Sequence, residues 1–272
     1  MKELFEQLRK KKPLIHNITN YVTVNDVANV LLASGASPIM ADDEAEVEEI
    51  TALSDGLNIN LGTLQQNKII SMKKAGKKAK ALNHPVTLDP VGVGASSWRL
   101  HQALALCQEI HFDVIRGNMS EIKALIKQQG QGHGVDASEH DRISQDNLDS
   151  CIEFVKYSAR QMQTIIVVTG ETDLVSDGQR CYVIKNGTPA MRQISGTGCQ
   201  LSALICAFVT ANDQAKPEAV AAAVCTMGLA GEIAQMHMAD GEGNATYRHR
   251  IIDAISLMTG EDLERGAKYE IR

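Results

Sequence analysis

The sequence Gly196-Thr197-Gly198-Cys199 combines two glycines and a thiol directly before a run of small and apolar residues. A glycine-rich turn that opens a helix exposes backbone N–H groups, and such groups bind phosphate. The pattern therefore predicts an anion-binding site at the start of a helix. Cys199 would point into that site, although a cysteine taken alone is more often a small buried residue.

Other polar residues follow short runs that have the composition of buried strands. In open α/β sheets ligands collect at the carboxyl ends of the strands, so we expect these residues to gather at one edge. Carboxylates there suit Mg²⁺, while arginine and backbone N–H groups suit phosphates. The residues are Asp89 after 85–88, Arg116, Asn118 and Glu121 after 112–115, Thr169 and Glu171 after 165–168, and Gly196–Cys199 after the strand-like 191–195.

Each of these residues also has a purely structural interpretation. Asp89 precedes a proline and is as readily a turn residue as a metal ligand. Asn118 and Glu121 have the spacing of a helix capping box, which we favour there and which does not exclude a second role. Arg116 could be a surface ion-pair partner, and Thr169 could simply end a strand. Their joint placement at strand ends favours a metal–nucleotide site.

A second polar cluster occupies the segment 16–40. It begins with amides at Asn17, Asn20 and Asn25, becomes helical from about Tyr21, and ends in a turn and a strand that delivers Met40. Neutral amides with a thioether suit a small heteroaromatic ligand. Helix capping and a core methionine are an equally acceptable interpretation.

Short apolar runs alternate with longer helical patterns along the chain. This alternation predicts an α/β fold with a mostly parallel sheet covered on both faces, in one domain over residues 1–272. Segment 128–141 is the most loop-like, and a surface loop is favoured over a lid. The expected strands are 57–62, 85–92, 112–118 and 164–173, with a hairpin at 174–187; the expected helices are 68–82, 96–110, 120–129, 146–163, one after Gly198 and one over 216–238.

Net charge, cysteine spacing and the absence of several motifs exclude some classes of protein. The 272 residues carry a net charge of −6, which disfavours nucleic-acid and anionic-membrane surfaces. The six cysteines contain no C-x-x-C pair and suggest reduced thiols in the cytoplasm. We find neither a signal peptide nor an uncharged apolar run long enough for a membrane helix. P-loop, complete Rossmann and nucleophile-elbow motifs are absent.

Six blocks in order resemble the hydroxyethylthiazole kinase family, which has a ribokinase-like fold and acts in thiamine salvage. They are HNITNYVTVNDVANVLLASGASPIM, LNINLGTL, LDPVGVGAS, IRGNMSEI, VVTGETD and SGTGCQLSAL, and they cover most of the chain. GTGC is the sharpest of them, because related sugar and vitamin kinases usually have Asp where Cys199 stands. Near the C-terminus, Gly241-Glu242-Gly243-Asn244 departs from a GPGS/T turn that is frequent in the family.

The resemblance implies a three-layer α/β/α sandwich and ATP-dependent phosphorylation of the primary alcohol of 4-methyl-5-(2-hydroxyethyl)thiazole. It also implies a cytoplasmic homotrimer with active sites at subunit boundaries. Met40, Gly196 and Asn25 would contact the thiazole, and Cys199, Gly196 and Gly198 would form the catalytic turn. Arg116 and Thr169 would bind ATP, while Asp89 and Glu121 would organise Mg²⁺.

Three other functions remain open at this point. A kinase for hydroxymethylpyrimidine or pyridoxal is disfavoured by Cys199 and the asparagine-rich start. An ADP/ATP-dependent NAD(P)H-hydrate dehydratase of the same fold should keep an acid at the Cys199 position. A non-catalytic nucleotide-binding protein would bind ATP without turnover.

Overall fold

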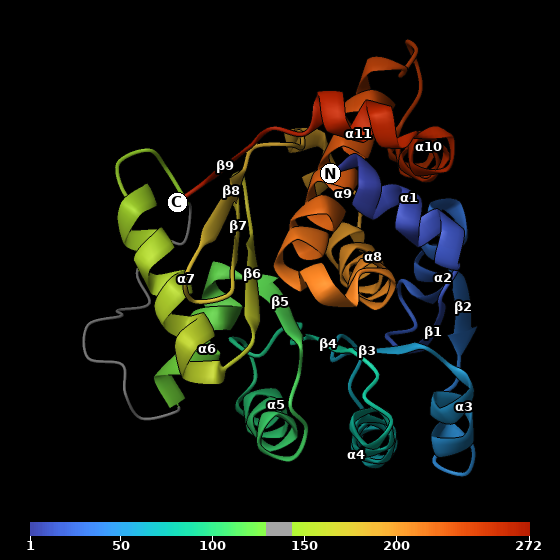
Figure 1. Ribbon diagram of the computed structural model, residues 1–272, viewed down its shortest axis with the longest axis vertical. Helices are drawn as coiled ribbons and strands as arrows, with labels where there is room; N and C mark the ends of the chain where they lie inside the picture. The colour runs from blue at the N-terminus through green and yellow to red at the C-terminus, as the bar shows by residue number, and fades with distance from the viewer. Residues whose placement is uncertain (129–142) are drawn as a thin grey trace.

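A computed structural model describes residues 1–128 and 143–272 and shows a sheet between two layers of helices (Figure 1). Within these residues the sheet has nine strands in the order β2-β1-β3-β4-β5-β6-β7-β8-β9. The strands from β2 to β6 run parallel, and β7, β8 and β9 pair antiparallel at one end. The strands are β1 (Leu14–Ile18), β2 (Ser37–Met40), β3 (Gly56–Asn60), β4 (Val86–Asp89), β5 (Val114–Asn118), β6 (Ile165–Thr169), β7 (Asp173–Ser176), β8 (Cys181–Ile184) and β9 (Tyr269–Ile271).

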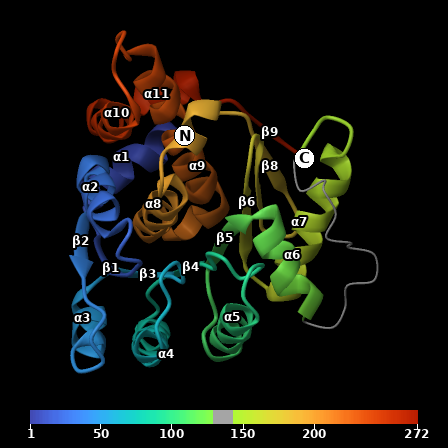
Figure 2. The ribbon, with the colours of Figure 1, turned by 180° about the vertical axis from the view of Figure 1, so that it is seen from behind.

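Two hydrophobic clusters pack against opposite faces of the sheet. Figures 1 and 2 show α3, α4 and α5 on one face and α8 and α9 on the other. The first layer comprises α3 (Val47–Leu53), α4 (Gln66–Ala81), α5 (Ser97–Glu109), α6 (Met119–Gln128) and α7 (Leu148–Met162); the second comprises α1 (Lys2–Lys11), α2 (Val24–Ser34), α8 (Thr197–Ala211), α9 (Lys216–Met236), α10 (Asn244–Leu257) and α11 (Gly260–Gly266). The predicted three-layer fold is confirmed.

The sheet and the central helices form where the sequence is almost continuously apolar. Strand β6 reads Ile-Ile-Val-Val before Thr169, as expected for a parallel strand covered on both faces. Helices α8 and α9 consist mainly of small and apolar residues, and both are buried along most of their length. Small side chains let these two helices pack closely against each other and the sheet.

The structure corrects three details of the sequence interpretation. The segment 191–195 is not strand-like, because Thr188 caps a 3-10 helix that Pro189 opens and that ends at Gln193. Helix α2 begins at Val24 rather than near Tyr21. The polar segment at 14–18, for which no strand is predicted, forms β1 inside the sheet. The loop predicted at 128–141 lies, apart from its first residue, outside the described residues.

One helix of the described chain is long and apolar enough to cross a membrane by length and composition. It spans Asp213–Met236, and 78% of its most apolar window is buried inside the protein. Its main part, α9, packs on α8, α10 and strands β7 and β8. These contacts are those of a core helix.

His16 is a buried histidine that ties β1 to the segments beside it. Its side chain is fully buried, with Nδ1 3.0 Å from Thr51 Oγ1 and Nε2 2.8 Å from the carbonyl oxygen of Ala41. Burial lowers the pKa of the imidazole, opposed by the hydrogen bond to Ala41. The unfolded chain therefore binds a proton more readily than the folded chain does.

We expect the free energy of unfolding to fall as the pH drops below about 6.5, the ordinary histidine pKa, towards the lower folded value. Urea unfolding at about pH 7.5 and about pH 5.5 measures this slope. His16→Gln should flatten it, whereas His101→Gln, at an exposed histidine, should not. Equal slopes in wild type and His16→Gln would show that His16 does not contribute.

Candidate active site

The glycine turn for which anion binding is predicted lies at the start of α8. Gly196 is the N-cap residue at φ 89°, a left-handed conformation that favours glycine. A Cβ there would lie 2.3 Å from Thr23 Cγ2, so only glycine fits against α2. The first backbone N–H groups of a helix have no intrahelical acceptor and carry the positive end of its dipole. The turn therefore presents these donors at the carboxyl edge of the sheet.

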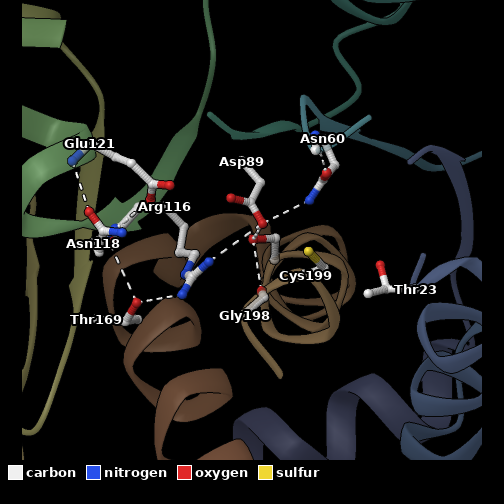
Figure 3. Close-up of polar contacts among 12 residues, drawn as sticks. Thr23, Asn60, Asp89, Arg116, Asn118, Glu121, Thr169, Gly198 and Cys199 are labelled. Atoms are coloured by element: carbon white, nitrogen blue, oxygen red, sulfur yellow. Dashed lines mark hydrogen bonds and ion pairs between the residues drawn. The ribbon is translucent and has the colours of Figure 1, made fainter. Parts of the chain in front are cut away.

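Arg116 supplies the fixed positive charge beside this turn. It lies between Asp89 and Thr169 (Figure 3), donating from Nη2 to Thr169 Oγ1 and lying 3.5 Å from Asp89 Oδ2 through Nη1. A Cβ on Gly198 would lie only 2.4 Å from Nη1, so the guanidinium packs directly on the backbone of the turn. Its Nε is buried without a partner within the described residues. Arg116, Thr169 and Gly198 thus form one cationic corner.

Asp89 is the buried carboxylate of the site. It ends β4 at 0% exposure, and its Oδ2 accepts hydrogen bonds from Asn60 (2.9 Å) and Ser202 (2.8 Å). Burial raises the pKa of Asp89 to about 6, against the opposing effects of Arg116 and Ser202. Its Oδ1 is buried and has no hydrogen-bond partner among the described residues. An anionic oxygen in that position is available to a cation.

Glu121 caps α6, as its spacing from Asn118 predicts. The Asn118 N–H donates to Glu121 Oε2 at 2.8 Å, and the Glu121 N–H donates to Asn118 Oδ1 at 2.9 Å. The Gly92 N–H donates to Glu121 Oε1 at 2.9 Å. The carboxylate is therefore held by backbone donors while it remains near enough to contribute to the raised pKa of Asp89. Glu121 can therefore cap α6 and also interact with a hydrated cation.

Cys199 lies on the opposite side of the turn from Arg116 (Figure 3). Its side chain is half-buried, and Asn20 Nδ2 donates to Sγ at 3.3 Å. Burial, followed by the charge of Asp89, raises the thiol pKa above its ordinary value, despite opposing hydrogen bonds. At neutral pH the group is a thiol, which makes it a weak base.

A cleft of about 320 Å³ opens on the Arg116 side of the turn. Arg116, Thr169 and Gly198 line it together with apolar residues of α9 such as Val224 and Met227. A cationic corner joined to an apolar wall suits a ligand that has both an anionic and an aromatic part.

The remaining predicted substrate residues lie apart from these contacts. Met40 ends β2, half-buried, and packs on the cluster that includes α8. Asn25 is exposed on α2. Two polar residues that hold the site, Asn60 and Ser202, were missed, although Asn60 ends a buried strand just as Asp89 does.

The oxygen ligands at this edge of the sheet suit a Mg²⁺ ion that is bound to a nucleotide better than a metal ion coordinated by protein side chains alone. Within residues 1–128 and 143–272, no three His, Cys, Asp or Glu side chains gather as a metal site. Mg²⁺ on a triphosphate needs only one or two carboxylates, because phosphates and waters complete its coordination. Asp89 Oδ1, which has no hydrogen-bond partner among the described residues, meets that requirement together with the nearby Glu121.

An anionic ligand bound beside a neutral one is what small-molecule kinases with a ribokinase-like fold require, and the comparisons assign the chain to this class. The chain belongs to the hydroxyethylthiazole kinase family, whose model matches residues 5–261. The resemblance drawn from the six sequence blocks is thereby confirmed.

Individual relatives agree with this membership. A Clostridium acetobutylicum protein named hydroxyethylthiazole kinase is 52% identical, over 99% of this chain and 99% of its own length. A solved hydroxyethylthiazole kinase protein from Pyrococcus horikoshii OT3 has a TM-score of 0.88 and 34% identity, covering 100% of this chain and 98% of its own. A Staphylococcus aureus pyridoxal kinase solved with AMP-PCP and pyridoxal, at TM-score 0.62 and 16% identity over 96% of this chain and 98% of its own, shares the fold alone.

Proposed function

We propose that this enzyme transfers the γ-phosphoryl group of ATP to the primary alcohol of 4-methyl-5-(2-hydroxyethyl)thiazole. The observation that carries the proposal is the start of α8, where the first backbone N–H groups of the helix lie between a fixed cation and a half-buried thiol. Membership of the hydroxyethylthiazole kinase family names the acceptor.

ATP binds in the cleft on the Arg116 side. Arg116 and Thr169 contact its phosphates, and the apolar wall from α9 receives the base. The guanidinium is already oriented by Thr169 and by its packing on Gly198, so little side-chain freedom is lost on binding.

The backbone of the α8 turn stabilises the transferring group. Phosphoryl transfer has a loose transition state, so positioning and charge stabilisation provide most of the rate enhancement. The N–H groups of Gly198 and Cys199 donate to its equatorial oxygens. The P–O bond to ADP breaks as the bond to the acceptor oxygen forms, and the alcohol loses its proton late, to an oxygen of the transferred phosphoryl group or to water. Cys199 therefore contacts the hydroxyl without having to be a strong base.

Asp89 and Glu121 hold Mg²⁺ when the nucleotide is bound. Bound there, the ion would neutralise charge on the phosphates. Asp89 Oδ1, which has no hydrogen-bond partner among the described residues, and Glu121, whose oxygens already accept N–H groups, would hold the ion directly or through water.

The acceptor lies on the other side of the turn. Gly196, Met40 and Asn25 contact the thiazole ring. Asn25 is exposed on α2, and we propose that another subunit of a homotrimer completes the active site on this side. We place the enzyme in the cytoplasm, with no nucleic-acid or membrane partner.

An acceptor panel tests this function. ADP release is measured with ATP, Mg²⁺ and either the thiazole alcohol, hydroxymethylpyrimidine, pyridoxal or no acceptor. We expect turnover with the thiazole alcohol far above the others. Preference for another alcohol would assign a related kinase. ATP binding without turnover would support a binding protein, and a hydrated NADH substrate tests the dehydratase.

Cys199→Asp is expected to retain or raise kcat. The carboxylate is a stronger base at neutral pH, and Asn20 Nδ2, now 3.3 Å from Sγ, can donate to it. Steady-state kinetics with the thiazole alcohol measure the effect, and Cys199→Ala serves as the comparison without a base. An inactive Cys199→Asp that still binds ATP would contradict this role.

A further inference from the structure

Asn20, between β1 and α2, has every polar atom of its side chain engaged. It is 4% exposed, and its Oδ1 accepts from the Val22 N–H, the Thr23 N–H and Thr23 Oγ1, each at 3.1 Å. Its Nδ2 donates to Asn60 Oδ1 at 2.9 Å and to Cys199 Sγ at 3.3 Å. An amide nitrogen has two hydrogens, so both are used.

The direction of these hydrogen bonds is fixed from both ends. At one end the Asp89 carboxylate accepts from Asn60 Nδ2 at 2.9 Å, which leaves Asn60 Oδ1 to accept from Asn20 and from the Gly62 N–H. At the other end two backbone N–H groups require an oxygen on Asn20. Turning either amide over would place donor against donor, so each amide has one acceptable orientation.

This orientation determines how the thiol is presented. Cys199 Sγ receives the Asn20 N–H, so its own hydrogen cannot lie along that direction. Thr23 Oγ1, which lies near the thiol, donates its hydrogen to Asn20 Oδ1 at 3.1 Å. A lone pair of the sulfur is left for a hydroxyl that approaches the mouth of the α8 turn.

We propose that Asn20 is a positioning residue for phosphoryl transfer, whose amide holds Cys199 Sγ as a hydrogen-bond acceptor for the hydroxyl of a neutral alcohol. The inference rests on the proposed function and adds to it a residue that acts through Cys199. It assigns the same amide two separate roles: the oxygen holds the turn that precedes α2, and the nitrogen orients the thiol.

The substitution Asn20→Asp keeps the role of the side-chain oxygen and removes the role of the nitrogen. A carboxylate oxygen still accepts the Val22 and Thr23 N–H groups, but both donors are lost and a negative charge faces the sulfur. Asn29→Asp is the matched control, because Asn29 lies on α2, the helix that follows Asn20, and among the described residues its Nδ2 donates to the Asn25 carbonyl alone, at 2.8 Å. Asn20→Ser is a second variant, which removes both amide N–H donors on a shorter side chain without adding charge.

The first measurement needs no substrate. Cys199 is alkylated with iodoacetamide at fixed pH, and its modification is followed by mass spectrometry of its peptide. Loss of the donor disfavours the thiolate, so we expect alkylation ~10-fold slower in Asn20→Asp and ~3-fold slower in Asn20→Ser. Asn29→Asp should match wild type. Unchanged rates in both Asn20 variants would overturn the proposal.

The second measurement is kinetic. We expect Asn20→Asp to raise KM for the thiazole alcohol ~10-fold while leaving KM for ATP within about twofold. In a Cys199→Ala background the same substitution should have little effect, because the sulfur it acts through is gone. An equal effect in both backgrounds would overturn the proposal. If wild type transfers no phosphate to the thiazole alcohol, the proposed function fails, whereas the alkylation result still decides the role of Asn20.

Discussion

Asp89→Asn is expected to lower kcat at least ~100-fold without unfolding the protein. The substitution keeps the shape of the side chain, and the amide oxygen can still accept from Asn60 and Ser202, now at 2.9 and 2.8 Å. It removes the anionic Oδ1, the buried atom that has no partner within the described residues. The charge that would hold Mg²⁺ against the phosphates is lost.

The Asp89→Asn variant should be more stable than wild type at neutral pH, although it is less active. Burial raises the pKa of Asp89 to about 6, above the value of an unfolded aspartate, so its stabilising contribution is present at low pH and is lost as the pH rises through about 6. At neutral pH the ionised group costs free energy that Asn does not. We expect Asp89→Asn to raise the free energy of unfolding by ~1–3 kcal/mol, measured by urea unfolding.

Asp113→Asn is the control for a half-buried carboxylate elsewhere. Asp113 lies at the amino end of β5 and accepts from Lys80 (3.0 Å), Lys216 (2.7 Å) and the Val86 N–H (2.9 Å). That variant should lose stability but keep its kcat. A normal kcat in folded Asp89→Asn would remove Asp89 from the active site.

Gly198→Ala is expected to lower kcat/KM for ATP ~100-fold, with little loss of stability. A Cβ at Gly198 would lie 2.4 Å from Arg116 Nη1, 2.6 Å from Nη2 and 2.8 Å from Cζ. The guanidinium is the end of a flexible side chain, so it can move away and the fold survives. In moving it leaves Thr169 and Asp89, and the new methyl group occupies the approach to the N–H groups of the turn.

Gly243→Ala provides the matched control. Gly243 has φ −119°, and a Cβ there would meet nothing within 4 Å. Its kinetics and thermal stability should match wild type. Should Gly198→Ala bind and use ATP as wild type does, the nucleotide does not approach this turn, and the assignment of Arg116 to ATP would fail with it.

Hydrophobic pattern was sufficient to predict most of the fold. The strands β3 to β6 and the helices α4 to α9 follow apolar runs and helical periodicity, and their alternation specified a parallel sheet. Strand β1 escaped prediction because it carries His16 and Asn17, which are buried at 0% and 1% exposure through hydrogen bonds rather than by apolar character. The apolar residues Met191 and Ile194 suggested a strand, but Pro189 and the Thr188 cap impose a 3-10 turn.

The site was predictable only in part. The capping pair Asn118 and Glu121 was predictable because it depends only on the spacing of the two residues, which can be read from the sequence. The contact between Asn20 and Cys199 joins residues 179 positions apart, and it depends on the packing of α8 beside β1. Such a contact follows from tertiary structure and has no local signal. The same holds for Ser202 and Asp89, 113 positions apart.

The most direct test of this account is a crystal structure of the protein with Mg²⁺, a non-hydrolysable ATP analogue and the thiazole alcohol. The account predicts the terminal phosphate about 3 Å from the backbone nitrogens of Gly198 and Cys199, with the cation on Asp89 Oδ1. The alcohol oxygen should lie between that phosphate and Cys199 Sγ. A triphosphate bound away from the start of α8, with Arg116 still on Thr169 and Asp89 Oδ1 still without a partner, would contradict it.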